Sequence, residues 1–131
     1  MSKKRILLVD DDLELCEELA ELLRDEGYLV DNTSDALKGA GLVRENRYDV
    51  AILDFKMPGL SGVDLLKTIK AGNPKTRVLF VSGKPFVGRL LQEAKVAELV
   101  EGIISKPFDE KTLLDKIRGS RCAGGRSPRS G

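Results

Sequence analysis

Apolar residues recur along this chain in two alternating patterns. Short runs rich in branched aliphatic residues are separated by longer segments in which apolar residues return every three or four positions. The short runs predict β-strands at 5–9, 28–31, 49–53, 77–81 and 102–105. The longer segments predict α-helices at 13–26, 35–44, 62–71, 86–100 and 109–118, with 86–100 the least regular. The chain is therefore expected to alternate strand and helix.

The strand runs are apolar at consecutive positions rather than at every second position. The run ILLV at 6–9 and the run VLFV at 78–81 have no polar face. Such runs are typical of parallel strands that helices cover on both sides. Together with the strand–helix alternation, they predict an α/β fold: a doubly wound, five-stranded parallel sheet with helices on both faces.

Capping residues and a Gly-rich segment indicate the expected limits of the helices and of the domain. Gly27 is a plausible C-terminal cap of the first helix, and Ser34 and Ser61 are plausible N-caps of the second and third. Residues 119–131 are rich in Gly, Arg and Ser and predict a flexible tail or the start of a linker. A single domain is expected over residues 1–118.

Composition narrows the class of protein. The 131 residues carry 41% hydrophobic and 33% charged residues and a net charge of +1, as in soluble globular domains, so direct nucleic-acid binding is not expected. No apolar run reaches the length of a membrane span or a signal peptide, so we expect no membrane association and a cytoplasmic location. Two cysteines make a disulfide framework improbable; Cys16 is expected near the core and Cys122 in the tail.

The sequence contains no histidine. This excludes histidine-based acid–base catalysis, Ser/His and Cys/His nucleophile pairs, and most zinc sites. Any chemistry within the chain must use carboxylates, lysines and hydroxyl groups.

Polar residues follow four of the predicted strands at the point where each strand ends. Three carboxylates, Asp10 to Asp12, come after the first strand; Asp54, Ser82 and Lys106 come after the third, fourth and fifth. Because the carboxyl ends of parallel strands meet at one edge of a sheet, these side chains are expected to converge. Clustered carboxylates repel one another unless a cation compensates them, and a cluster of oxygens suits Mg²⁺. A carboxylate beside Mg²⁺, with a hydroxyl and an ammonium opposite, is arranged to attack phosphorus and form an aspartyl phosphate.

Each of these residues also has a simpler interpretation. Asp11 or Asp12 alone could cap the following helix, although capping explains only one acid of the three. Asp54 could form an Asx turn before a loop rich in Pro and Gly. Ser82 could be an ordinary loop serine, and Lys106 could be solvated. The placement of all of them at strand ends favours a joint site.

Four segments resemble the receiver domains of two-component response regulators, the CheY-like family. They are RILLVDDD at 5–12, AILDFKMPGLSGVDLL at 51–66, VLFVSGKP at 78–85 and SKPF at 105–108. Their order and separation match the family, and the resemblance covers about residues 4–118. It implies a flavodoxin-like (βα)5 fold and a phosphorylation-dependent signalling switch rather than an enzyme acting on other substrates.

The resemblance implies roles for individual residues. Asp54 would accept a phosphoryl group from a sensor histidine kinase or a phosphotransfer protein. Asp10, Asp11, Asp54 and the backbone carbonyl of Lys56 would hold Mg²⁺. Ser82 would be the switch hydroxyl, and Lys106 would contact the phosphoryl group. The missing histidine fits this assignment, since the donor would lie on another protein. The downstream effector is unknown, and a monomer or weak dimer is expected.

Two departures from the family pattern bear on mechanism. The family often has Tyr or Phe three residues before the lysine, and here the position holds Ile103, which cannot report phosphorylation by the same ring movement. Lys56 and Lys84 flank the expected phosphoryl group, and the lack of an acid or amide at Lys56 predicts slow self-hydrolysis. Two alternatives stay open: a receiver-like interaction module that is not phosphorylated, and a Mg²⁺-dependent phosphohydrolase, against which the absence of a second acid two residues after Asp54 argues.

Overall fold

The computed structural model describes residues 4–55, 62–83, 87–93, 95–106 and 109–119. The strands are β1 (Arg5–Val9), β2 (Leu29–Thr33), β3 (Val50–Asp54), β4 (Arg77–Ser82) and β5 (Gly102–Ser105). The helices are α1 (Leu13–Asp25), α2 (Ala36–Glu45), α3 (Gly62–Gly72), α4 (Val87–Glu93) and α5 (Glu110–Gly119), with a short 3-10 turn, η1, at Ala97–Leu99.

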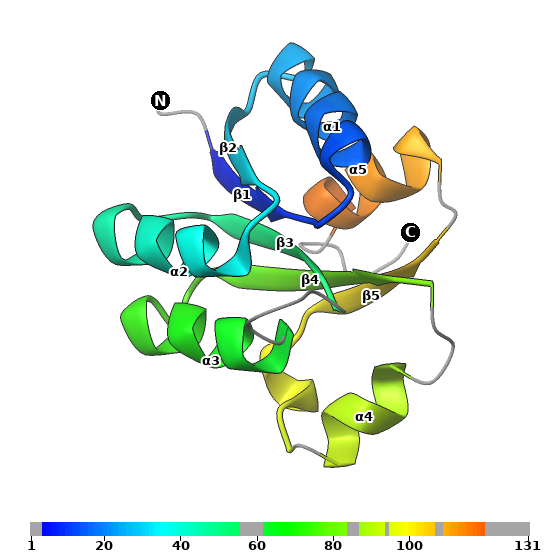
Figure 1. Ribbon diagram of the computed structural model, residues 1–131. Helices are drawn as coiled ribbons and strands as arrows, with labels where there is room; N and C mark the ends of the chain where they lie inside the picture. Colours follow the sequence, from blue (N-terminus) through cyan, green and yellow to red (C-terminus); the bar gives the residue numbers. More distant parts are fainter. Residues whose placement is uncertain (1–3, 56–61, 84–86, 94, 107–108, 120–131) are drawn as a thin grey trace.

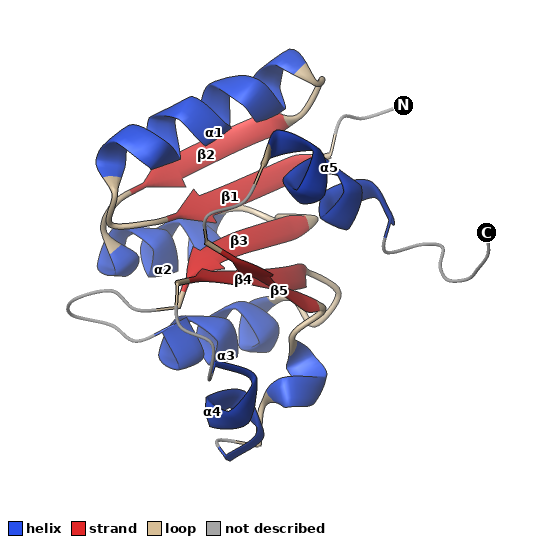
Figure 2. Ribbon diagram, turned by 90° about the vertical axis from the view of Figure 1, so that its right-hand side faces the viewer, coloured by secondary structure: helices blue, strands red, loops and turns tan. Residues whose placement is uncertain are grey.

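The five strands form one parallel sheet in the order β2-β1-β3-β4-β5. Helices α1 and α5 cover one face of the sheet, and α2, α3 and α4 lie on the other side (Figures 1 and 2). The winding direction changes at β1, because the chain goes first to β2 on one side and then to β3 on the other. The predicted doubly wound sheet is therefore confirmed.

Successive residues of each central strand enter different cores. In β1, Leu7 and Val9 pack with α2 and α3, whereas Ile6 and Leu8 pack with α1 and α5. All four side chains are buried because both faces of the sheet are covered. This arrangement explains why the strand runs are apolar at consecutive positions.

Helix and strand limits agree with the sequence-based prediction to within one residue except in three places. The second strand runs to Thr33, because its pairing with β1 continues to the register Val9↔Thr33. The predicted N-cap Ser34 is wrong: Asp35 caps α2, and its carboxylate accepts a hydrogen bond of 2.9 Å from the Leu37 amide. The segment predicted as one helix at 86–100 contains α4 and the separate η1 turn.

Other predicted features agree with the structure or lie outside the described residues. Gly27 follows α1 with φ +99°, the left-handed conformation that a C-terminal glycine accommodates. Cys16 is buried in the α1 core as expected. Ser61 and Cys122 lie outside the described residues. Among the helices that the structure describes, none combines the length and the apolar character needed to span a bilayer.

Candidate functional site

Asp54 ends β3 at the carboxyl edge of the sheet and is only 7% exposed. It is held there because β3 pairs with β4 in the register Asp54↔Val81. Ser82, the next residue of β4, is also buried. The backbone N–H of Lys106 donates a 2.8 Å hydrogen bond to the Ser82 carbonyl, which places the lysine directly beyond β5. The pairing of three strands thus brings Asp54, Ser82 and Lys106 to one edge.

The three acids after β1 have different environments. Asp12 is the N-cap of α1, and its carboxylate accepts a 3.1 Å hydrogen bond from the Leu15 amide. The backbone N–H of Asp12 in turn donates to Asp10 Oδ1 at 2.9 Å and orients that carboxylate. Asp10 is 2% exposed, whereas Asp11 is exposed. Helix capping therefore explains Asp12, but it does not explain Asp10 or Asp11.

Three carboxylates meet at this edge of the sheet. Asp10, Asp11 and Asp54 each offer one oxygen, and the three oxygens lie within 4.8 Å of one another. Lys106 approaches the same group: its Nζ is 3.2 Å from Asp10 Oδ2 and 3.9 Å from Asp54 Oδ2. We refer to Asp10, Asp11 and Asp54 as the acidic cluster. Among the described residues, Lys106 is the one whose ammonium group pairs with this cluster, through Asp10 and Asp54.

The electrostatics of the acidic cluster favour a further cation. Asp10 and Asp54 are almost wholly removed from water, and a buried charge is costly unless it is paired. Oxygen ligands on opposite sides of a Mg²⁺ ion are about 4.2 Å apart, since each bond is about 2.1 Å long. The oxygens of the acidic cluster lie within 4.8 Å of one another, so they would draw closer together around such an ion. The cluster therefore fits a small, hard divalent cation.

Part of the predicted site lies outside the described residues. This applies to Lys56, whose carbonyl is the fourth predicted metal ligand, and to Lys84. Their expected roles stay predictions.

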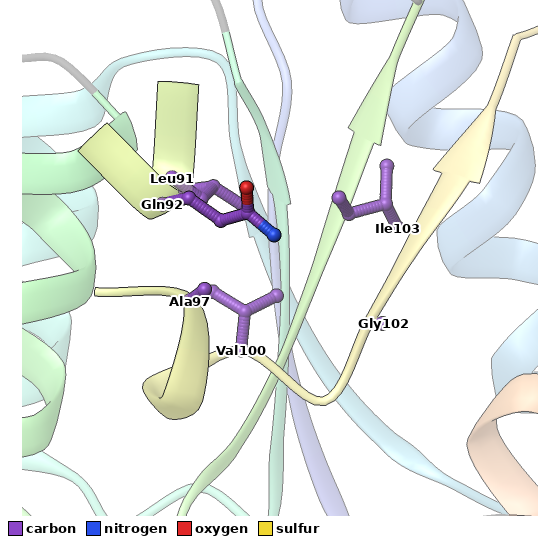
Figure 3. A pocket seen from close by; sticks show the side chains of 6 residues that line it. All are labelled: Leu91, Gln92, Ala97, Val100, Gly102 and Ile103. Atoms are coloured by element: carbon purple, nitrogen blue, oxygen red, sulfur yellow. The ribbon is translucent and has the colours of Figure 1, made fainter. Parts of the chain in front are cut away.

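Ile103 of β5 lines a hollow of about 210 Å³ between β5, α4 and η1. Figure 3 shows the lining residues: Leu91, Gln92, Ala97, Val100, Gly102 and Ile103. The lining is mostly apolar, and Ile103 packs against the core beneath it. This is the position at which the family resemblance leads one to expect an aromatic ring.

Sequence reasoning missed the aromatic residues next to the site. Phe55 follows Asp54 directly, and Phe80 precedes Ser82 by two residues. Their rings meet edge to face, with centroids 5.4 Å apart and an interplanar angle of 78°. The signal available in the sequence was an aromatic residue close to the end of each of two adjacent strands.

Comparison with known sequences identifies the relatives of this chain. The DNA-binding response regulator MtrA of Mycobacterium tuberculosis is 33% identical over 123 residues, which cover 88% of this chain and 50% of that protein. The transcriptional regulatory protein DltR of Streptococcus agalactiae is 30% identical over 115 residues, again 50% of its length. The chain thus spans about half the length of the curated relatives it matches.

Solved structures show the same relationship. The CheY-like receiver domain protein of Methanospirillum hungatei superposes with a TM-score of 0.81 at 28% identity, covering 89% of this chain and 92% of that chain. TrrA of Thermotoga maritima, solved in complex with Mg²⁺-BeF, superposes with a TM-score of 0.75 at 26% identity over 88% of this chain and 96% of that chain. Residues 6–118 also match the family described as the response regulator receiver domain. With its parallel sheet and acidic cluster, the chain belongs to the receiver domains of two-component response regulators.

Proposed function

We propose that this receiver domain is a signalling switch controlled by phosphorylation of Asp54. In this proposal Mg²⁺ is bound by Asp10, Asp11, Asp54 and the carbonyl of Lys56, and the donor is a phosphohistidine on a sensor histidine kinase or phosphotransfer protein. The observation that carries the proposal is the acidic cluster, with its oxygens within 4.8 Å of one another beside Lys106. The Mg²⁺-BeF complex of the neighbour TrrA supports it by similarity.

The proposed reaction is a simple transfer of a phosphoryl group. An oxygen of Asp54 attacks phosphorus, the P–N bond to the donor imidazole breaks, and its electron pair stays on the imidazole nitrogen. Bound Mg²⁺ supplies charge neutralisation for the transferring group. Lys106 contributes a second positive charge, and the near-complete burial of Asp54 limits the access of water to the acyl phosphate.

The switch follows from a change in the partners of Lys106 and Ser82. Lys106 lies 3.2 Å from Asp10 in the unmodified protein. A phosphoryl group on Asp54 adds charge and strong acceptor oxygens, so we expect Lys106 and Ser82 to move towards it. Because Ser82 ends β4 and Lys106 follows β5, this movement would alter the surface around α4 and β5 where an effector would bind.

Incubation with acetyl phosphate and MgCl₂ tests the proposal, with intact-protein mass spectrometry and phosphate release as readouts. The wild-type protein is expected to gain one phosphoryl group in a Mg²⁺-dependent manner, and Asp54→Asn is expected to gain none. Asp12→Asn is the matched control, since Asn also caps helices well and Asp12 lies outside the acidic cluster. A wild-type protein that is not modified would contradict the proposal.

The same experiment separates the two alternatives. An unmodified protein would support an interaction module that works without phosphorylation, an alternative that Ile103 favours because the expected aromatic ring is missing. Continuous release of phosphate without accumulation of the phosphoprotein would instead indicate a phosphohydrolase.

A further inference from the structure

The main chain that follows Asp54 is held from three directions. The first contact is a hydrogen bond: the N–H of Phe55 donates to the Val81 carbonyl at 3.0 Å. This bond continues the β3–β4 pairing one residue beyond the end of β3. The peptide between Asp54 and Phe55 is thereby tied to β4.

The second contact is the aromatic pair. The Phe55 ring meets the Phe80 ring edge to face at 5.4 Å. Phe80 is fully buried in the core formed with α2 and α3, so its ring is a fixed surface. Phe55 itself is only partly buried, and its ring packs against this surface.

The third contact comes from the first residue of α3. A methyl group at Gly62 would lie 2.8 Å from Phe80 Cε1, 2.9 Å from the Phe55 carbonyl oxygen and 3.2 Å from Phe55 Cα. Such distances are shorter than ordinary van der Waals contact, so only glycine lets α3 approach this closely. The start of α3 therefore lies close to Phe55 Cα and to the Phe55 carbonyl, one residue beyond Asp54.

We propose that Phe55 and Gly62 are positioning residues that set the direction of the Asp54 carboxylate for metal binding. Neither residue offers a side-chain ligand, and both act through the main chain next to Asp54. A magnesium site demands near-ideal octahedral geometry, so a displacement of a few tenths of an ångström at this peptide changes its affinity. This inference rests on the proposed function, because it assumes that the acidic cluster binds Mg²⁺.

The test is an NMR titration with MgCl₂, run beside thermal unfolding on each variant. Gly62→Ala and Phe55→Leu are expected to raise the Mg²⁺ Kd about 10- to 100-fold, the range seen when groups that orient metal ligands are lost. Phe55→Tyr keeps the ring and should restore the affinity towards that of the wild type. Gly41→Ala is the matched control, since a methyl group there meets nothing within 4 Å; its Kd should not change.

The outcomes separate the inference from the proposed function. If the wild-type protein binds Mg²⁺ and the folded Gly62→Ala and Phe55→Leu variants bind it equally well, the two residues have only a structural role and the inference is overturned. If Gly62→Ala does not fold, Phe55→Leu decides alone. If the wild-type protein itself shows no titration with MgCl₂, the proposed function fails, and the inference fails with it.

Discussion

At the amino end of the sheet charged side chains lie in matched pairs, whereas at the carboxyl end the described residues place three carboxylates beside the ammonium group of Lys106. Arg77, at the start of β4, makes a bidentate pair with Glu101 at 2.8–3.0 Å and also donates to the carbonyls of Lys116 and Ile117 at the end of α5. Arg118 of α5 lies 2.6 Å from Glu26 after α1. These contacts join helix ends to the sheet and leave the charges locally balanced.

At the carboxyl end the charges of the described residues are unbalanced. Asp10, Asp11 and Asp54 carry three negative charges, and Lys106 provides one positive charge within 4.0 Å of two of them. The two ends belong to the same strands, and they differ in the balance of positive and negative side chains. The comparison indicates that ion pairs at one end hold helices in place, whereas at the other end the described residues concentrate negative charge.

The largest predicted effect is at the carboxyl end. Mg²⁺ at about 100 times its Kd should raise the free energy of unfolding by about 2.7 kcal/mol, because it binds only the folded state. Urea unfolding with and without MgCl₂ measures this. Asp11→Asn should abolish the increase and, without Mg²⁺, should be slightly more stable than the wild type because repulsion is relieved. Glu17→Gln, an exposed acid on α1, is the control and should leave the Mg²⁺ effect unchanged. If Mg²⁺ stabilises Asp11→Asn as much as the wild type, the proposed role of the carboxyl end in metal binding is contradicted.

The second prediction concerns the amino end. Arg77→Met should lower the free energy of unfolding by about 2 kcal/mol, since it removes a bidentate ion pair and two hydrogen bonds to α5. Mg²⁺ affinity should be unaffected. Arg47→Met, at an exposed arginine before β3, is the matched control. Urea unfolding gives the stability, and a variant as stable as the wild type would show that the pair is not structural.

The third prediction is a pH dependence at the same end. Burial and a 2.6 Å hydrogen bond donated to Asp31 raise the pKa of Tyr48 well above its ordinary value of 10.0. Its contribution to stability is therefore complete below pH 10 and is lost as the pH rises towards the folded-state pKa, by on the order of 1 kcal/mol per pH unit. Tyr48→Phe should remove this alkaline slope. Denaturant unfolding between pH 9 and pH 11 measures it, and an unchanged slope would count against this origin.

The smallest predicted effect is kinetic. Lys56→Asn would place an amide near the proposed aspartyl phosphate, where it could orient a water molecule, so the phosphoprotein should lose its phosphate severalfold faster. Such a change is below about 1.4 kcal/mol in activation free energy. Phosphate release after removal of acetyl phosphate gives the lifetime. An unchanged or longer lifetime in the variant would contradict this role for Lys56.

The fold was largely predictable because its signals are local. The run ILLV at 6–9 has no polar face, and the structure shows why: alternate residues enter the cores on the two faces of the sheet. The less successful predictions concern element limits that depend on residues distant in sequence but close in space. The second strand extends to Thr33 because β1 continues to pair with it, and Asp35 rather than Ser34 caps α2 because the helix begins at Ala36.

The residues that converge at the candidate site were predictable from the sequence, whereas the packing contacts around them were not. Asp10, Asp11, Asp54, Ser82 and Lys106 stand at strand ends, and the strand order places those ends side by side. The contact of Gly62 with Phe55 and Phe80 could not be predicted, since no periodicity relates a helix N-terminus to aromatic rings on two other elements.

The sequence by itself determined the parallel sheet covered on both faces and the residue types available for chemistry, because hydrophobic periodicity and the lack of histidine are properties of the chain alone. Only the tertiary structure decided which acids face one another. Asp10, Asp11 and Asp12 are consecutive, yet Asp12 turns to cap α1 while Asp10 and Asp11 meet Asp54, 44 residues along the chain from Asp10. Local backbone hydrogen bonds from the Asp12 and Leu15 amides orient Asp10 and Asp12, whereas Asp54 comes beside Asp10 and Asp11 only because β3 pairs with β1 in the sheet.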